Sequence, residues 1–190
     1  MKAMNPAHKK FSRRARVATG GAVLAAVALS GFGAVSANAS APATTSAAAA
    51  AVTDQATTTS THLTIDAATK AAQAALHAAE KEDQRVTVAV VDRNGNTIVT
   101  LRGDGAGPQS YESAERKAFT SAAWNAPTSQ LVERLQQTPN LKDIPGTLFL
   151  AGGVPVTAGK GPIAGIGVAG APSGALDEKF AQAGADAVAG

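Results

Sequence analysis

The chain has 190 residues, enough for one domain with a tail. It has no cysteine, so the domain must fold on its hydrophobic core alone. Its formal charge of +3 is unevenly distributed. All fourteen acidic residues follow Ala39, whereas six of the seventeen Lys and Arg precede it, which leaves eleven basic and fourteen acidic residues after Ala39. The basic character therefore belongs to the first segment, and we expect no nucleic-acid partner.

Residues 1–39 have the features of an export signal. A basic segment, Met1 to Arg16, precedes an apolar run, Val17 to Val35, and Ala37-Asn38-Ala39 supplies the small-x-small pattern of a signal-peptidase site. Ser12-Arg13-Arg14 indicates the twin-arginine route. A membrane anchor is the alternative, but four glycines dilute the apolar run. We expect a secreted, extracellular or cell-wall-associated protein that begins at Ser40.

The next segment, residues 40–61, is rich in Ala, Thr and Ser and has almost no large apolar residue, so we expect a disordered linker. The folded domain then covers residues 62–190. It begins with a helix for which Thr64 is the expected N-cap. Alanines recur at helical spacing up to Ala79, which predicts close packing of this helix, and Lys81 to Gln84 ends it.

Residues 86–102 predict a β-hairpin around Asn94-Gly95, a pair that suits a two-residue type I′ turn. The expected register places Val88 opposite Leu101 and Val90 opposite Val99, on a wholly apolar face. The reverse face pairs Val91 with Ile98 and is mixed. Such a pattern favours helices on one face of the sheet and solvent or a second subunit on the other.

The rest of the chain alternates short helices with short strands. A helix is expected over Ser110–Trp124 with Ser110 as its N-cap, and Thr128 should cap a short helix that ends near Leu135. Ser173 should cap the last helix. Apolar runs separated by glycines predict three strands, at Thr147–Ala151, Val154–Thr157 and Ile163–Ala169. The order αββααβββα predicts an α+β fold with an antiparallel sheet of about five strands.

Four segments, VAVVDRNGN, ERKAFTSAAW, LFLAGGVPV and GIGVAGAPSGALDE, resemble the GlcG/HbpS-like haem-binding family from Leu63 to about Ala187. The resemblance implies a profilin-like subunit that forms homo-oligomers. It also implies an extracellular protein that binds haem and senses haem, iron and redox stress as an accessory to a membrane histidine kinase. A haem-degrading enzyme and a haem- or iron-scavenging oligomer are the alternatives.

Haem iron usually takes His, Met, Cys or Tyr, and the chain after Ala39 offers only His62, His77 and Tyr111. We expect both histidines to be solvated. The helix Ser110–Trp124 aligns hydroxyl, cation and aromatic side chains at Ser113, Lys117, Thr120 and Trp124. Without the resemblance, an ordinary helix flank is the favoured explanation of this stripe. With the resemblance, we expect five residues to contact haem: Tyr111, Ser113, Arg116, Lys117 and Thr120. Arg116 or Lys117 would bind a propionate, and Thr120 would lie near the iron.

Two pairs of carboxylates suggest surface iron sites. Glu80 with Asp83, and Glu112 with Glu115, are each spaced three residues apart and so share a helix face, as hard cations require. Solvated surface acids are the commoner meaning of such pairs.

Residues 165–170 match G-x-G-x-x-G, but no parallel βαβ unit surrounds them, so a dinucleotide site is not expected. These glycines more readily permit close backbone or subunit approach. Together with the mixed face of the hairpin, this Gly-rich strand predicts a homo-oligomer.

Overall fold

The computed structural model describes residues 49–190. The predicted export signal, residues 1–39, and the start of the predicted linker lie outside this part of the chain. Residues 49–61 are exposed throughout and contain one short 3-10 helix, Asp54–Ala56. No helix within 49–190 combines the length and the hydropathy needed to cross a membrane.

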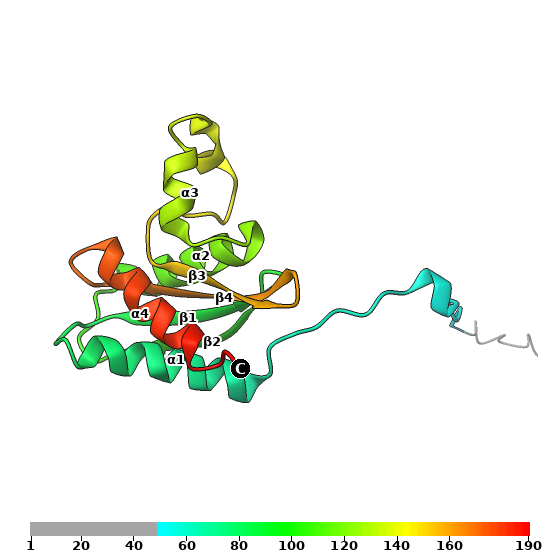
Figure 1. The fold of residues 1–190 in the computed structure, drawn as a ribbon, viewed down its shortest axis with the longest axis horizontal. Coiled ribbons are helices and arrows are strands. Elements are labelled where there is room, and N and C mark those ends of the chain that lie inside the picture. Colours follow the sequence, from blue (N-terminus) through cyan, green and yellow to red (C-terminus); the bar gives the residue numbers. More distant parts are fainter. Residues whose placement is uncertain (1–48) are drawn as a thin grey trace, which may run out of the picture. The chain divides into compact units, whose positions relative to one another are not determined.

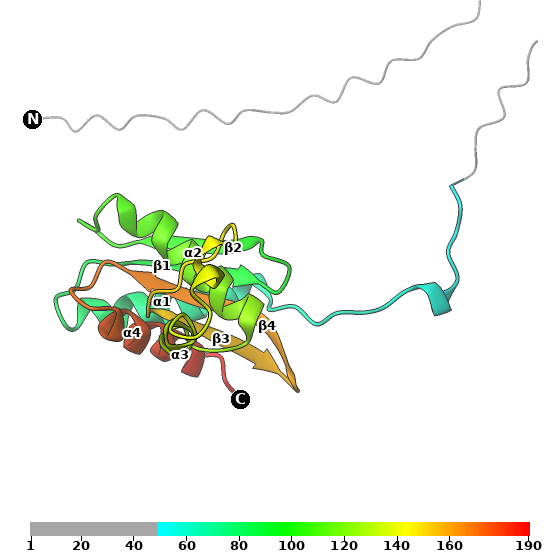
Figure 2. The same ribbon diagram turned by 90° about the horizontal axis from the view of Figure 1, so that it is seen from above.

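The folded part contains four helices, one further 3-10 helix and four strands (Figure 1). In chain order they are α1 (Ile65–Glu80), β1 (Thr87–Asp92), β2 (Thr97–Arg102), α2 (Gln109–Trp124), α3 (Thr128–Arg134), η2 (Pro139–Asp143), β3 (Gly153–Ala158), β4 (Gly161–Ala169) and α4 (Gly174–Asp186). The strands form one antiparallel sheet in the order β2-β1-β4-β3. Helices α1 and α4 cover one face of it, and α2 covers the other (Figures 1 and 2).

This architecture confirms the predicted α+β class, but the sheet has four strands rather than five. The apolar run Thr147–Ala151 forms no strand in the structure. Its backbone is bonded to α2 instead, because the Arg116 guanidinium donates to the Thr147 carbonyl (2.9 Å) and the Leu148 N–H donates to the Thr120 hydroxyl (2.8 Å). The extra strand was predicted from apolar content alone, whereas in the structure polar side chains of α2 form hydrogen bonds with the backbone of this segment.

The face under α1 and α4 is packed with aliphatic side chains. The predicted alanine stripe of α1 is buried, and it meets Val86, Val88 and Val90 of the hairpin and Phe180 of α4. Because alanine side chains are short, α1 lies close to both the sheet and α4. This cluster is the main hydrophobic core of the described residues.

The β1–β2 hairpin exists with the predicted register over most of its length, but its turn is of another type. Of Asn94 and Gly95, only Gly95 has a positive φ (92°), whereas type I′ requires it at both. The Gly95 N–H donates to the Asp92 carbonyl (3.1 Å), and the Asp92 carboxylate accepts the N–H groups of Asn94 (2.8 Å) and Asn96 (2.9 Å). The Asp92 side chain thereby stabilises a longer turn, and the register shifts after Val90, so that Val91 pairs with Thr97 rather than Ile98.

On the reverse face of the hairpin, β1 is covered by α2, whereas the sequence suggested solvent or a second subunit there. Arg102 of β2 stays exposed. Ala89 and Val91 pack against alanines of α2. The approach is close because β4 carries glycine there: a Cβ atom at Gly165 or Gly167 would lie 2.1 Å from a carbonyl oxygen of α2. The expected homo-oligomer loses this part of its rationale and stays a prediction.

Two of the four predicted N-caps, Thr64 and Ser173, are confirmed. The hydroxyl of Thr64 accepts the Ala67 N–H at the start of α1, and that of Ser173 accepts the Leu176 N–H at the start of α4. Thr128 is not an N-cap, because it is the first residue of α3 and Pro127 precedes it. Ser110 is not an N-cap either, because α2 begins one residue earlier. Its buried hydroxyl instead bonds to the Thr87 hydroxyl (2.7 Å) and so ties α2 to the sheet.

Candidate functional site

A cavity of ≈ 620 Å³ opens between α3 and α4. Its apolar walls are Val132 of α3, Leu150 and Ala151 of the segment before β3, and Ala171 and Pro172 of the turn after β4. Leu150 is 56% exposed although it is a large aliphatic side chain. The volume is in the range of small-molecule sites, and a mostly apolar lining with a few polar groups is typical of them.

The polar floor of this cavity is a buried ion pair between α2 and α4. The Lys117 ammonium donates to the Asp177 carboxylate (2.7 Å) and to the Val168 carbonyl (3.0 Å), and both charged side chains are about 95% buried. The second carboxylate oxygen of Asp177 accepts the Ala171 N–H (3.0 Å). Burial raises the pKa of Asp177, although hydrogen bonds from Lys117 and the backbone oppose the shift.

The first turn of α4 also lines the cavity, through Ser173, Gly174 and Ala175. The N–H groups of Gly174 and Ala175 have no acceptor within the helix, because they precede its first intrahelical bonds. On the far side of this turn, the Glu178 carboxylate accepts the N–H groups of Ser129 (2.9 Å) and Gly152 (3.3 Å). Glu178 thereby fixes α3 and the segment before β3 relative to α4, and so shapes the mouth of the cavity.

The five predicted haem-binding residues of α2 do not form one exposed surface. Lys117 lines the cavity, whereas Thr120 is fully buried and its hydroxyl donates to the Arg116 carbonyl (2.7 Å). Tyr111 is 47% exposed at the start of α2, and Ser113 is half-buried. The structure therefore separates Lys117 and Thr120, which point inward, from Tyr111, Ser113 and Arg116 nearer the surface.

The residue that the sequence missed is Asp177, together with the apolar walls of the cavity. Its position early in α4 is explained by the helix dipole, so nothing local marks it as the partner of Lys117, sixty residues earlier. The remaining member of the α2 stripe, Trp124, packs edge-to-face on Phe149, with the two ring centroids 5.8 Å apart. It belongs to a small core under α3.

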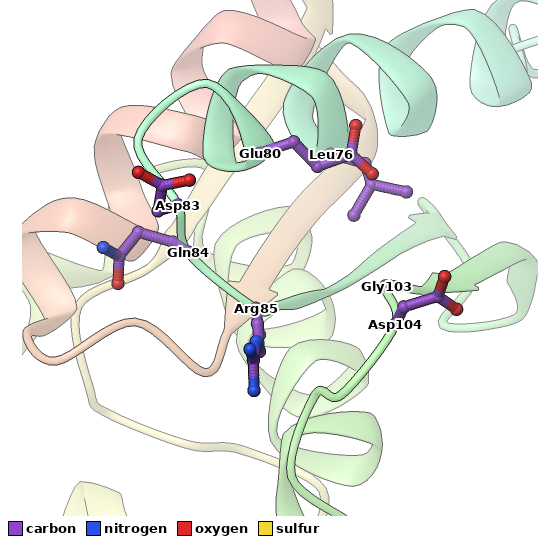
Figure 3. A pocket seen from close by; sticks show the side chains of 7 residues that line it. All are labelled: Leu76, Glu80, Asp83, Gln84, Arg85, Gly103 and Asp104. Atoms are coloured by element: carbon purple, nitrogen blue, oxygen red, sulfur yellow. The ribbon is translucent and has the colours of Figure 1, made fainter.

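The carboxylate pair Glu80 and Asp83 lies at a second, smaller depression of ≈ 230 Å³, where α1 ends. The predicted shared helix face is wrong, because α1 ends at Glu80 and Asp83 follows it with a φ of 54°. Asp104 and Arg85 line it as well, and Figure 3 shows the three carboxylates on different sides of the depression rather than converging on one point. Throughout residues 49–190, no three His, Cys, Asp or Glu side chains are grouped so that they could hold a metal ion.

The other carboxylate pair is engaged within α2 and with the sheet. Glu112 lies 3.6 Å from the Arg116 guanidinium, and Glu115 accepts a hydrogen bond from the Thr100 hydroxyl (3.1 Å). Both predicted metal pairs therefore consist of two carboxylates without a third ligand from the described residues.

Comparison with known proteins identifies the family. The family model "Haem degrading protein HbpS-like" matches residues 63–186. The chain belongs to the HbpS-like family. A crystal structure of HbpS is 70% identical over 74% of this chain and 100% of that chain, with a TM-score of 0.73. An HbpS double mutant from Streptomyces reticuli, with two glutamates changed to aspartate, is also 70% identical, over 74% and 96% of the two chains (TM-score 0.72).

A more distant HbpS-like fold comes from a complex of PduOC with haem. It is 26% identical over 67% of this chain and 95% of that chain, with a TM-score of 0.61. A search of the curated proteins found no match.

Proposed function

We propose that this HbpS-like domain binds haem in the cavity between α3 and α4. The observation that carries the proposal is the 70% identity to HbpS across the folded domain. The description of the family as haem-degrading and the haem complex of PduOC support it. The cavity supports it in turn, because it is a wide, mostly apolar opening with a charged floor.

The residues of the cavity fit haem in a particular way. Val132, Leu150 and Pro172 offer apolar contact to a porphyrin ring, and Lys117 lies below them. No His, Met, Cys or Tyr lines the cavity, and the hydroxyls of Ser129 and Ser173 are bonded to Glu178 and to the Leu176 N–H, so solvent is left as an iron ligand. Bound haem would supply a redox-active iron, and weak ligation leaves that iron open to exchange and to oxidants.

Haem titration of the full chain, followed by the Soret band, tests this function. We expect one saturable site per chain. Leu150→Asp places a charge on the apolar wall and should weaken binding by roughly tenfold or more. The matched control is Ile65→Asp, since Ile65 is similarly exposed (57%) at the start of α1 and does not line the cavity. The absence of a saturable Soret change in the unmodified chain would remove the proposal.

The variant Tyr111→Phe distinguishes haem binding in the cavity from haem binding on the exposed surface of α2. If haem lies in the cavity, Tyr111→Phe leaves the spectrum unchanged, as do His62→Ala and His77→Ala, because none of these residues lines it. If the iron instead takes the Tyr111 phenolate, Tyr111→Phe alone removes the phenolate-to-iron absorption, and the site moves to Tyr111, Ser113 and Arg116.

We propose, further, that the protein acts outside the cell and reports haem, iron and redox stress to a membrane histidine kinase. The predicted export signal supports the location, and the family resemblance supports the partner. Replacing Arg13 and Arg14 by Lys should trap the precursor inside the cell. Co-purification of the kinase's extracellular domain with the secreted chain, dependent on haem or iron, tests the partnership.

Haem degradation is the second candidate function, and the description of the family favours it. Turnover in the presence of peroxide should release iron and an open-chain tetrapyrrole in amounts that exceed the protein. A stoichiometric loss of the Soret band without turnover would favour sensing or scavenging.

Surface iron binding completes the proposal. Because the carboxylates of Glu80 and Asp83 do not converge in the structure (Figure 3), both become ligands only when the turn after α1 moves, with water in the other positions. Calorimetric titration with ferrous iron should detect a weak site that Glu80→Gln with Asp83→Asn removes. Glu112→Gln with Glu115→Gln is the matched control, because these carboxylates already have Arg116 and Thr100 as partners. Equal loss in both double variants would contradict the assignment.

A further inference from the structure

Several hydrogen-bond donors around the floor of the cavity have no acceptor among the described residues. Both oxygens of Asp177 are occupied, one by Lys117 and the other by the Ala171 N–H. The Lys117 ammonium has three N–H groups, of which two have acceptors, Asp177 and the Val168 carbonyl. Gly174 and Ala175 add two backbone N–H groups from the first turn of α4.

All of these donors favour an acceptor that bears negative charge. The N-terminus of a 13-residue helix carries partial positive charge, and Lys117 is a full cation with only 4% of its surface exposed. The acids nearby are Asp177, which is paired with Lys117, Glu178, which is bonded to Ser129 and Gly152, and Glu133, which is exposed to solvent at the mouth. The deep end of the cavity therefore favours an acceptor that bears negative charge.

The backbone around this end leaves room for close approach. Gly174 has no side chain, and a Cβ atom there would lie 2.8 Å from the Ala151 carbonyl oxygen. At Gly152 a Cβ atom would lie 2.7 Å from the Lys117 ammonium. Glycine at these two positions allows the segment before β3 to lie against both α4 and Lys117, which brings the apolar wall next to the donors.

We propose that the cavity recognises its ligand through a carboxylate, which the first turn of α4 and Lys117 bind while an apolar body lies against Val132 and Leu150. This inference rests on the proposed haem function and extends it, because it assigns the propionate edge of the porphyrin to α4. The free acid is bound, and the neutral ester is discriminated against. Iron is not needed for this recognition.

A matched pair of variants at Ala175 tests the inference in the full chain. Ala175 is exposed, lines the cavity and is the second residue of α4, where an acidic side chain favours the helix. Ala175→Glu therefore preserves folding but places a negative charge beside the bound carboxylate. Ala175→Gln has nearly the same size without the charge, so the difference between the two variants reports charge alone.

The ligands are haemin, iron-free protoporphyrin IX and protoporphyrin IX dimethyl ester, and the dissociation constants are measured by absorbance and by quenching of Trp124 fluorescence. We expect Ala175→Glu to bind both free acids roughly tenfold or more weakly than Ala175→Gln, since charges in a partly enclosed site are screened less than on an open surface. The two variants should bind the dimethyl ester equally, and more weakly than the unmodified chain binds the free acid.

Failure of this inference is distinguishable from failure of the haem function. If haemin binds saturably but equally to Ala175→Glu and Ala175→Gln, or if the ester binds as tightly as the free acid, haem binding stands and the carboxylate assignment is wrong. If the unmodified chain binds no haemin but still binds protoporphyrin IX with the predicted charge dependence, the carboxylate assignment stands and the haem function is wrong. If none of these compounds binds, both are wrong.

Discussion

The two faces of the sheet are built differently. Toward α1 and α4, large aliphatic side chains such as Ile166 and Val168 fill the core. Toward α2, glycine and alanine bring backbones together, and the buried polar residues Thr87, Lys117 and Ser121 lie there as well. Every buried side-chain nitrogen and oxygen in residues 49–190 has a hydrogen-bond partner. The first face supplies hydrophobic stability, whereas the second holds polar groups in fixed positions and borders the cavity.

The largest expected effect is at the charged floor. Asp177→Ala leaves the Lys117 ammonium buried without its carboxylate, which should lower the free energy of unfolding by about 3–5 kcal/mol. Denaturant titration measures it. The double variant Lys117→Met with Asp177→Leu removes both charges and should recover a large part of the loss. If the double variant is as unstable as Asp177→Ala, or less stable, the ion pair is not what the α2 face depends on.

Gly167 tests the close approach of α2. Gly167→Ala places a Cβ atom 2.1 Å from the Ala114 carbonyl oxygen, so α2 must shift, at a cost of about 1–3 kcal/mol or more. Because α2 carries Lys117, haem binding should weaken along with stability. Unchanged stability and unchanged haem affinity would mean that the two backbones are not held in contact.

The neighbouring residue on β4 supplies the contrasting experiment on the other face. Ile166 is fully buried in the aliphatic core, and Ile166→Val removes one methylene group, which should cost about 0.5–1.5 kcal/mol. We expect the haem spectrum and affinity of the folded variant to be unchanged. A loss of haem affinity here comparable to that of Gly167→Ala would remove the distinction between the two faces.

The smallest effect is a dependence on pH. Because burial raises the pKa of Asp177 above 3.8, the folded state holds more protons than the unfolded state between 3.8 and the raised pKa. The part of Asp177's contribution to stability that depends on protonation is thus fully present below pH 3.8 and is lost as pH rises through the raised pKa. Subtracting the unfolding free energies of Asp177→Asn from those of the unmodified chain isolates this contribution. A difference that grows with pH would contradict the sign.

The features that the sequence predicted correctly depend on local signals. Thr64 and Ser173 cap helices through bonds to residues three positions away, and the hairpin register follows from alternation along neighbouring strands. The errors occurred where a side chain intervened. The Asp92 carboxylate selected the turn, and Arg116 and Thr120 bonded the backbone that would have formed a fifth strand.

The candidate site could be predicted only in part for the same reason. Lys117 was selected from the helical spacing of α2, but that spacing could not show which way the side chain points. Its direction depends on Asp177 and on the glycines of β4, which are distant in sequence and close only in the folded chain.

One edge of the sheet constrains how copies of this chain can assemble. β3 is an edge strand, and Pro155 in its middle has no N–H group to donate to a further strand. Continuous strand-to-strand growth from β3 is therefore interrupted, which protects the sheet from open-ended stacking. Subunits that associate are left with β2 or the helical surfaces as contacts, and these favour closed assemblies with a fixed number of copies over fibres.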